Sequence, residues 1–220
     1  MIIVKDLWED ILSVHPTTKI IYQKDKSFDI QRQSTFKKIV KKLNEIKFED
    51  YDLDILGDSY ENVVKDIMTG KVLGQFFTQP IIKSFMIELV NPQIDEKGQC
   101  ETVYDLAMGV AGFLISTIKH LKDQSKTRNI PLDWSFMTEK GLGGRETEID
   151  THQLAISNML IYSGHIFSKT LEKGDSIRDT ITNKYDIVLA NPPFGIKGLT
   201  YKDIHNSLRD EYLPIETNNA

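Results

Sequence analysis

The stretch TVYDLAMGVAGFL, residues 102–114, contains a short apolar run, a turn with two glycines and the first residues of an apolar helix. A strand, a glycine-containing turn and a helix in this order are typical of the opening unit of a nucleotide-binding α/β fold. The stretch Tyr185–Ala190 is the clearest strand of the sequence, because it is apolar and is stopped by Asn191-Pro192-Pro193. Since helices are predicted between these strands, the alternation favours a parallel, doubly wound sheet.

Two amphipathic helices are predicted before this unit. Apolar residues recur at i, i+3, i+4 and i+7 in the first helix, at Phe36, Ile39, Val40 and Leu43, and the other face of that helix is rich in lysine. The second helix has the same spacing at Tyr60, Val63, Val64, Ile67 and Met68. We therefore expect residues 1–70 to form a small helical domain and residues 71–220 to form an α/β domain.

Two more elements are predicted within the second domain. Thr78 is expected to cap a helix with Pro80 in its first turn, because these residue types favour those positions. This helix is expected to bury Ile82, Phe85, Met86 and Leu89. The glycines at positions 141, 143 and 144 predict a loop that leads through Glu146 to a helix at about 150–162.

Composition and charge narrow the class of protein. The chain carries 27 basic and 32 acidic residues, a net charge of −5, so it is no autonomous polycation built to bind nucleic acid. The single cysteine, Cys100, excludes an internal disulfide and fits a reducing compartment. The five histidines share no ligand spacing, so no metal site is expected. Neither a signal peptide nor a membrane span is predicted, and we expect a cytoplasmic protein.

The tetrapeptide Asn191-Pro192-Pro193-Phe194 is the most informative motif, because ligands bind at the carboxyl ends of strands in parallel sheets. The exocyclic amine of adenine is a poor nucleophile, since its lone pair is delocalised into the ring. The Asn191 side-chain carbonyl and the Pro192 backbone carbonyl can each accept one amine hydrogen and free the lone pair to attack a sulfonium methyl group. Phe194 offers a face on which a flipped base can stack. Methylation at cytosine C5 is disfavoured, because no cysteine lies in this loop.

Further motifs accompany this tetrapeptide in a fixed order: Gly74-Gln75-Phe76-Phe77-Thr78, the stretch 105–114, Gly144-Arg145-Glu146, and Gly174-Asp175-Ser176. With them, residues 55–197 resemble the γ-type N6-adenine DNA methyltransferases, and most closely the modification subunits of type I restriction–modification systems. The resemblance implies a Rossmann-like S-adenosylmethionine-dependent methyltransferase fold. It also implies a cofactor, S-adenosyl-L-methionine, and a partner, double-stranded DNA.

The resemblance assigns roles to individual residues. The catalytic set it implies is Asn191, Pro192, Pro193 and Phe194. In the cofactor site it implies, the loop at 74–78 folds over the cofactor carboxylate, Glu146 accepts the ribose hydroxyls and Asp175 lies near the adenine, while Asn158 falls at the family's helix asparagine. The full cofactor-binding set is Gln75, Phe76, Phe77, Thr78, Gln79, Asp105, Gly109, Val110, Ala111, Gly112, Phe113, Glu146 and Asp175.

The sequence departs from the family pattern in the cofactor loop and in length. Leu106, Met108 and Val110 stand where the family favours proline, a small residue and threonine. The family continues past its catalytic loop with further strands, so we expect four strands of a seven-strand sheet and a C-terminally incomplete, truncated chain.

Three functions are compatible with these residues. The first is methylation of adenine N6 in DNA, as a modification subunit that works with a specificity subunit and a restriction subunit. The second is methylation of protein glutamine or of RNA, since both are substrates of Asn-Pro-Pro-aromatic sites. The third is a non-catalytic remnant or assembly subunit, which the altered cofactor loop and the short chain favour.

Overall fold

The computed structural model describes residues 32–47, 51, 53–69 and 78–192. Predictions that concern Gln75, Phe76, Phe77, Pro193 or Phe194 therefore lie outside the described residues. The helices, including one π-helical turn, are α3 (Gln33–Asn44), α4 (Leu53–Thr69), α5 (Pro80–Val90), α6 (Gly112–Arg128), α7 (Trp134–Phe136), η2 (Met137–Gly141) and α8 (Ile149–Ser163). The strands are β1 (Val103–Asp105), β2 (Leu142–Glu146), β3 (Leu171–Lys173) and β4 (Ile187–Leu189).

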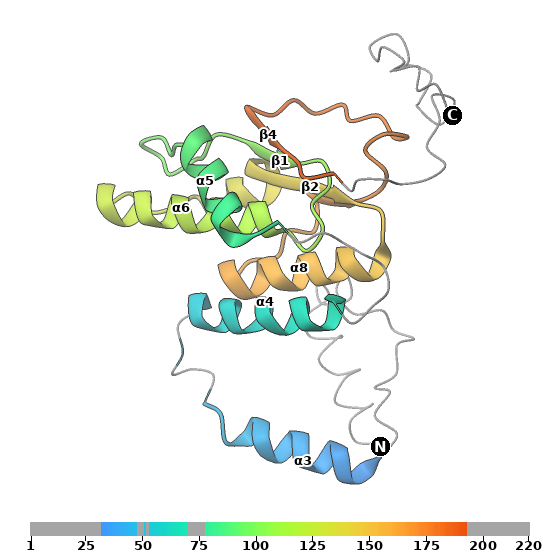
Figure 1. Cartoon of the computed structure of the whole chain (residues 1–220). Helices are drawn as coiled ribbons and strands as arrows, with labels where there is room; N and C mark the ends of the chain where they lie inside the picture. The colour runs from blue at the N-terminus through green and yellow to red at the C-terminus, as the bar shows by residue number, and fades with distance from the viewer. Residues whose placement is uncertain (1–31, 48–50, 52, 70–77, 193–220) are drawn as a thin grey trace, which may run out of the picture.

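The four strands form one parallel sheet in the order β3-β2-β1-β4, which confirms the predicted sheet type (Figure 1). The chain moves outward from β1 through β2 to β3 and then returns to place β4 on the other side of β1. This reversal next to β1 is the topological switch point at which open α/β sheets bind ligands. Within the described residues β4 pairs only with β1, and Val188 in its middle is 54% exposed.

The prediction of a glycine-rich loop at 141–144 is wrong, because Leu142–Glu146 form strand β2. Gly143 and Gly144 lie inside the sheet, between β1 and β3. A Cβ atom at Gly143 would lie 3.0 Å from the Tyr104 ring, and one at Gly144 would lie 3.0 Å from the Met108 side chain. The glycines are therefore explained by close packing against the neighbouring strand and its following loop, which sequence spacing did not reveal.

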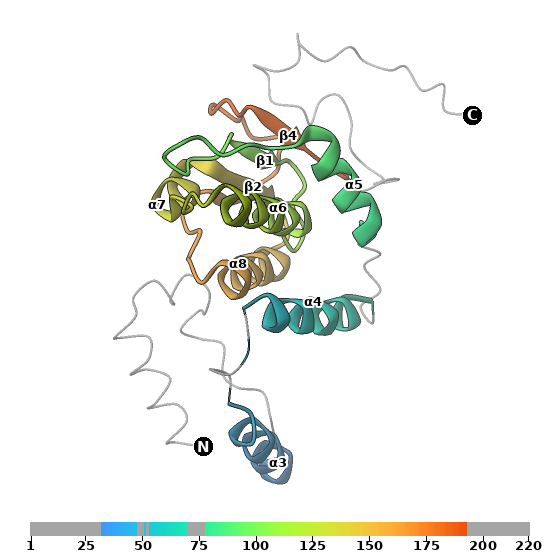
Figure 2. The same ribbon diagram turned by 90° about the vertical axis from the view of Figure 1, so that its left-hand side faces the viewer.

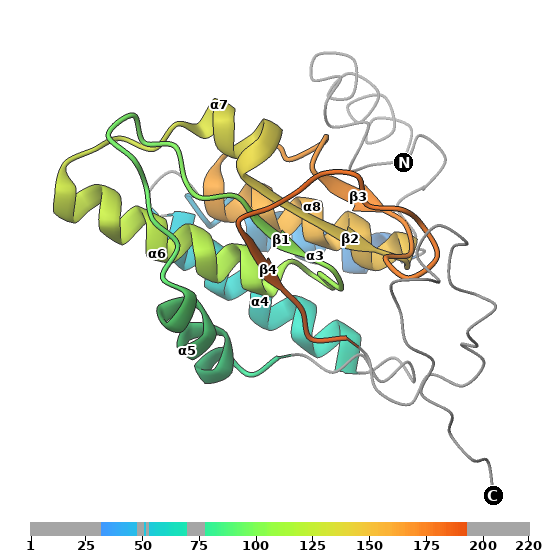
Figure 3. The same cartoon turned by 90° about the horizontal axis from the view of Figure 1, so that it is seen from above.

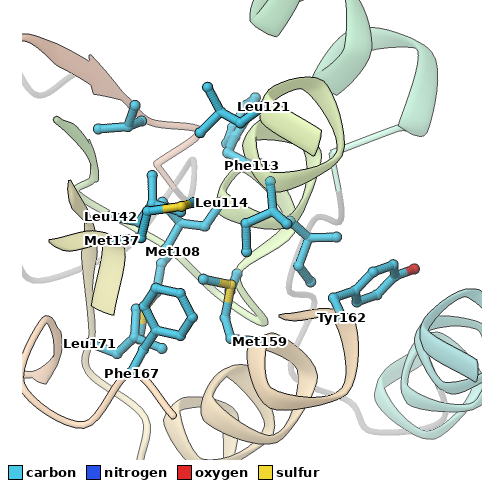
Figure 4. Close-up of a cluster of buried hydrophobic side chains, with 14 of the residues drawn as sticks. Met108, Phe113, Leu114, Leu121, Met137, Leu142, Met159, Tyr162, Phe167 and Leu171 are labelled. Atoms are coloured by element: carbon cyan, nitrogen blue, oxygen red, sulfur yellow. The ribbon is translucent and has the colours of Figure 1, made fainter. Parts of the chain in front are cut away.

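Helices α6 and α8 pack on the same side of the sheet, and α4 packs on the outer side of α8 (Figures 1 and 2). The main hydrophobic core lies between these two helices and the strands (Figure 4). Its fully buried side chains include Leu114, Ile118, Leu121, Met137, Leu142, Ile156, Met159 and Phe167. This layer fixes the strand ends, and hence the loops that follow them.

Helix α4 is joined to this core by a compact polar cluster. Asp58 accepts hydrogen bonds from Lys119 Nζ at 2.7 Å and from Tyr162 Oη at 2.6 Å. These two contacts hold the pKa of Asp58 below its usual range. Gly57, in the preceding position, lets the Tyr162 ring approach so closely that a Cβ atom there would lie 2.6 Å from it. Helix α4 thus packs on the α/β unit through α8.

The predicted helices are confirmed, but most of the predicted buried face of α5 is wrong: of Ile82, Phe85, Met86 and Leu89, only Met86 packs against the core. Helix α3 has no buried residue, whereas α4 buries Val64. In α5, Phe85 is 63% exposed and Leu89 is 72% exposed, and the buried residues are Lys83 and Ile87. Helix α5 is apolar on most sides, so its periodicity does not determine which side meets α6 (Figure 3). No helix among the described residues is both long and apolar enough for a bilayer crossing.

Candidate active site

The carboxyl ends of the strands meet around the loop that follows β1, residues 106–111. Leu106 N donates to Leu189 O at the end of β4 (3.2 Å), and Met108 N donates to Arg145 O in β2 (3.0 Å). From the segment after β3, Ser176 Oγ donates to Leu106 O at 2.6 Å. Because all four strand ends contact this loop directly or through the following segment, the loop has a fixed shape at the switch point.

The backbone of this loop takes the left-handed conformation at two positions. Gly109 has φ +53° and Ala111, which precedes α6, has φ +68°. Left-handed backbone is costly for residues other than glycine and concentrates at functional sites. A Cβ atom placed at Gly109 would meet no heavy atom within 4 Å, so open space adjoins the turn. The loop therefore leaves room for a ligand to approach the backbone.

Gly112, the first residue of α6, is required for a different reason. A Cβ atom at this position would lie 3.2 Å from the side chain of Lys83, which is buried on α5. The glycine thus allows α5 to pack beside the amino-terminal end of α6. Sequence spacing gave no signal for this contact, because the two residues lie on different helices.

Two carboxylates lie at the ends of β1 and β2. Glu146 Oε2 accepts from Gly109 N at 3.1 Å, and its Oε1 accepts from Glu148 N at 2.8 Å. Asp105 is 1% exposed, and its Oδ1 accepts from Ala107 N at 3.1 Å. Burial, together with the nearby charge of Glu146, raises the pKa of Asp105 to about 7. A buried carboxylic acid of this kind becomes ionised readily when a cation lies beside it.

Asn158 on α8 holds the same loop by a hydrogen bond to its backbone. Its Nδ2 donates to Val110 O at 3.0 Å. Its Oδ1 is buried, and no hydrogen bond to it is found within the described part of the chain. A buried oxygen that accepts no hydrogen bond lowers the stability of the fold by about 1–3 kcal/mol. The Asn158 oxygen therefore marks a place next to the loop where a further hydrogen-bond donor fits.

At the end of β4, Asn191 contacts the residue that precedes α5 by two positions. Asn191 Nδ2 donates to Thr78 Oγ1 at 2.9 Å, although 113 positions separate the two residues. Thr78 was predicted to cap α5, but the cap residue is Gln79, whose side chain makes no cap hydrogen bond. The predicted Pro80 at the first helical turn is confirmed.

The structure brings several of the predicted site residues together at the loop after β1. Gly109 lies in this loop, its backbone nitrogen donates to Glu146, and Asp105 directly precedes the loop. The side chains of Val110 and Phe113 are buried in hydrophobic clusters, so only their backbones can face a ligand. The Asp175 carboxylate accepts from Ile177 N at 2.9 Å and from the Arg178 guanidinium at 3.1 Å, so it closes its own turn. Within the described residues no group of acidic, histidine or cysteine side chains could hold a metal ion.

The sheet order and the glycine-containing loop after β1 form a Rossmann-like α/β fold, and the solved structures that share it include S-adenosylmethionine-dependent methyltransferases. A Listeria monocytogenes protein assigned to class I of these enzymes superposes with a TM-score of 0.57 at 15% identity, over 87% of this chain and 54% of that one. The type I restriction–modification methyltransferase subunit of Streptococcus thermophilus superposes with a TM-score of 0.61 at 22% identity, over 81% of this chain and 35% of that one.

Sequence comparison identifies the family. The family model described as N-6 DNA Methylase matches residues 51–220, and the chain belongs to this family. The chain is 28% identical to the type I restriction enzyme EcoEI methylase subunit of Escherichia coli over 166 residues, covering 72% of this chain and 31% of that subunit. It is 34% identical to the EcoKI methylase subunit of E. coli K12 over 156 residues, covering 64% and 28%. The chain thus spans less than a third of the length of each of these subunits that it matches.

Proposed function

We propose that this chain binds S-adenosylmethionine at the loop after β1 and takes part in methylation of adenine N6 in DNA. The observation that carries the proposal is the position of Asn191. Its carboxamide follows β4 at the switch point, while the loop that contacts Glu146 follows the adjacent strand. Methyl transfer requires that the methyl donor and the target amine are held close together. A cofactor loop after one strand, and a carboxamide that accepts a hydrogen bond from the amine after the neighbouring strand, would do this.

The residues around the loop fit this cofactor. S-adenosylmethionine supplies an electrophilic methyl group on a sulfonium and also carries an ammonium group, so it is cationic near its reactive end. The ionisable Asp105 suits a cationic ligand, and the open space at Gly109 suits close approach of a ligand to the backbone. We assign Glu146 to the ribose hydroxyls, because carboxylate oxygens at the end of β2 can accept from both.

The proposed chemistry of the chain lies in two carbonyl groups. The Asn191 carboxamide oxygen and the Pro192 carbonyl each accept one hydrogen of the target amine. These bonds favour a tetrahedral nitrogen, so they strengthen as the lone pair becomes available. Pro192 and Pro193 restrict the backbone, which keeps both acceptors in place before the substrate arrives. Phe194 is proposed to stack on the flipped base.

We further propose that recognition of the DNA sequence lies outside this chain. A net charge of −5 gives the chain no general attraction for the phosphate backbone. The relatives it matches are methylase subunits of type I restriction enzymes, so a specificity subunit and a restriction subunit are the partners we propose. We propose that this activity takes place in the cytoplasm, because the single cysteine of the chain fits a reducing compartment.

A methyl-transfer assay tests the proposal. Tritiated S-adenosylmethionine is incubated with the chain and its partner subunits, in parallel with duplex DNA, RNA and protein substrates. Label is expected in adenine N6 of the DNA, and Asn191→Ala is expected to reduce the rate by about 10²–10³ while cofactor affinity changes by less than a few-fold. Asn44→Ala, which replaces an exposed asparagine at the end of α3, serves as the matched control.

The alternative functions give different results in this assay. Transfer to RNA or to protein glutamine in place of DNA would replace the proposed substrate. Cofactor binding without transfer to any substrate would indicate a non-catalytic subunit. Near-normal methylation by the Asn191→Ala variant would contradict the catalytic role of Asn191.

A further inference from the structure

We propose that Thr78 is a positioning residue for Asn191, which orients the Asn191 carboxamide for the target amine. This inference rests on the proposed function and adds a role to a residue that the family resemblance assigns only to the cofactor. Thr78 Oγ1 accepts a hydrogen bond from Asn191 Nδ2 at 2.9 Å. The contact is partly buried, and it joins the start of α5 to the end of β4.

The direction of this hydrogen bond decides what Asn191 can do. A carboxamide carries its donor nitrogen and its acceptor oxygen about 120° apart on the same carbon. When the nitrogen donates to Thr78, the oxygen points away from Thr78 and can accept from a substrate amine. The reversed carboxamide would present its NH₂ group to the amine, and two donors repel each other. The Thr78 hydroxyl could also donate to the carboxamide oxygen, so it selects the productive orientation when its own proton is donated to another acceptor.

The two ends of the contact differ in how firmly the rest of the fold holds them. Thr78 lies next to Gln79, whose carbonyl accepts from Ile82 N and Lys83 N in the first turn of α5. Lys83 and Ile87 anchor α5 against α6. Asn191 follows β4, which pairs with β1 alone among the described strands. The hydroxyl of Thr78 thus ties a residue after an edge strand to a packed helix.

The contact also relates the two halves of the proposed site. The hydroxyl of Thr78 keeps its own proton while it accepts from Asn191. This proton can be donated to a cofactor group, as the family resemblance implies for the loop before α5. A single threonine would then link cofactor binding to the orientation of the amine acceptor. Valine has nearly the same shape as threonine but can neither accept from Asn191 nor donate to the cofactor, whereas serine can do both.

The first measurement follows the hydrogen bond itself in the 220-residue chain. Asparagine side chains are labelled with ¹⁵N, and the Asn191 NH₂ signal is assigned by its loss in Asn191→Ala. Thr78→Val is expected to accelerate exchange of these amide protons at least tenfold, and Thr78→Ser is expected to leave it unchanged. Thr127→Val, which removes an exposed hydroxyl near the end of α6, is the matched control.

The second measurement separates positioning from cofactor binding. At saturating S-adenosylmethionine, single-turnover transfer to duplex DNA by the chain with its partner subunits is expected to fall about tenfold in Thr78→Val and to recover in Thr78→Ser. Cofactor affinity, measured by calorimetry, is expected to fall in Thr78→Val and to be retained in Thr78→Ser, and saturation with the cofactor removes this effect from the measured rate. A tenfold rate change corresponds to about 1.4 kcal/mol, the scale of one oriented hydrogen bond.

Each other result overturns a defined part of the inference. Unchanged exchange in Thr78→Val would show that the hydroxyl does not hold Asn191. Faster exchange with an unchanged transfer rate would show a contact without a positioning role. Weaker cofactor binding with a normal rate at saturation would make Thr78 a cofactor contact only. A wild-type chain that transfers no methyl group would contradict the proposed function, and the exchange measurement would still decide whether Thr78 orients Asn191.

Discussion

Replacement of Asp105 by asparagine is expected to make the ligand-free chain more stable at alkaline pH. Burial raises the pKa of Asp105 to about 7, whereas its ordinary value is 3.8. The unfolded chain therefore loses this proton first, and stability falls as pH rises from about 4 to about 7. The gap between the two pKa values corresponds to on the order of 4 kcal/mol. Asparagine keeps the oxygen that accepts from Ala107 N and removes the charge.

Urea unfolding at several pH values measures this effect. Asp105→Asn and the wild type are expected to be equally stable near pH 3, because Asp105 is then neutral in the folded state and nearly neutral in the unfolded state. Their difference is expected to grow toward pH 8, in favour of the variant. Asp123→Asn, which removes one exposed charge from α6, is the control. A difference between variant and wild type that does not change with pH would refute the reasoning.

Three further predictions concern the loop, the α4 contact and the exposed side of α5. Glu146→Ala is expected to weaken S-adenosylmethionine binding at least tenfold by calorimetry, because the acceptor of Gly109 N is lost. The control Glu148→Ala is expected to leave the affinity unchanged. Equal affinities for Glu146→Ala and wild type would make Glu146 a surface acid only. Gly57→Ala is expected to lower the melting temperature, although alanine favours helices by roughly 0.5–1 kcal/mol, because its Cβ would lie 2.6 Å from the Tyr162 ring; a higher melting temperature would contradict this packing. Serine at the exposed α5 positions Ile81, Phe85 and Leu89 is expected to reduce self-association, measured by light scattering. Serine at the exposed α4 positions Ile55 and Val63 is expected to leave it unchanged. Equal effects at both helices would exclude a specific α5 surface.

The order of elements was predictable from sequence because local signals determine it. The spacing of apolar residues predicted α3 and α4, and the order of strand, glycine-containing turn and helix within 102–114 predicted β1, the central loop and α6. These signals depend on residues within one or two helical turns of each other. The proposed cofactor loop and the proposed catalytic tetrapeptide could be identified for the same reason, since each is a continuous stretch of sequence.

The errors concern features that depend on distant residues. Strand β2 was mistaken for a loop, because its glycines are explained only by Tyr104 and Met108 in the neighbouring segment. The buried side of α5 was predicted wrongly, because contact with α6 decides it and not apolar spacing. Thr78 was assigned to a helix cap, whereas its partner lies 113 positions away. Single-sequence patterns carry no information on such contacts.

The pairing of β4 with β1 has a consequence for the order in which the molecule folds. Thr102 and Asp186 hold the starts of these strands together, with Asp186 Oδ2 accepting from Thr102 N at 2.8 Å and from its hydroxyl at 2.7 Å across 84 positions. Contacts of such sequence separation form slowly, because a long loop must close first. Since chains emerge from the ribosome amino-terminal end first, β1, β2 and β3 can assemble before β4 is available. The nascent chain is therefore expected to form β1, β2, β3 and the loop after β1 before it adds the strand that carries Asn191.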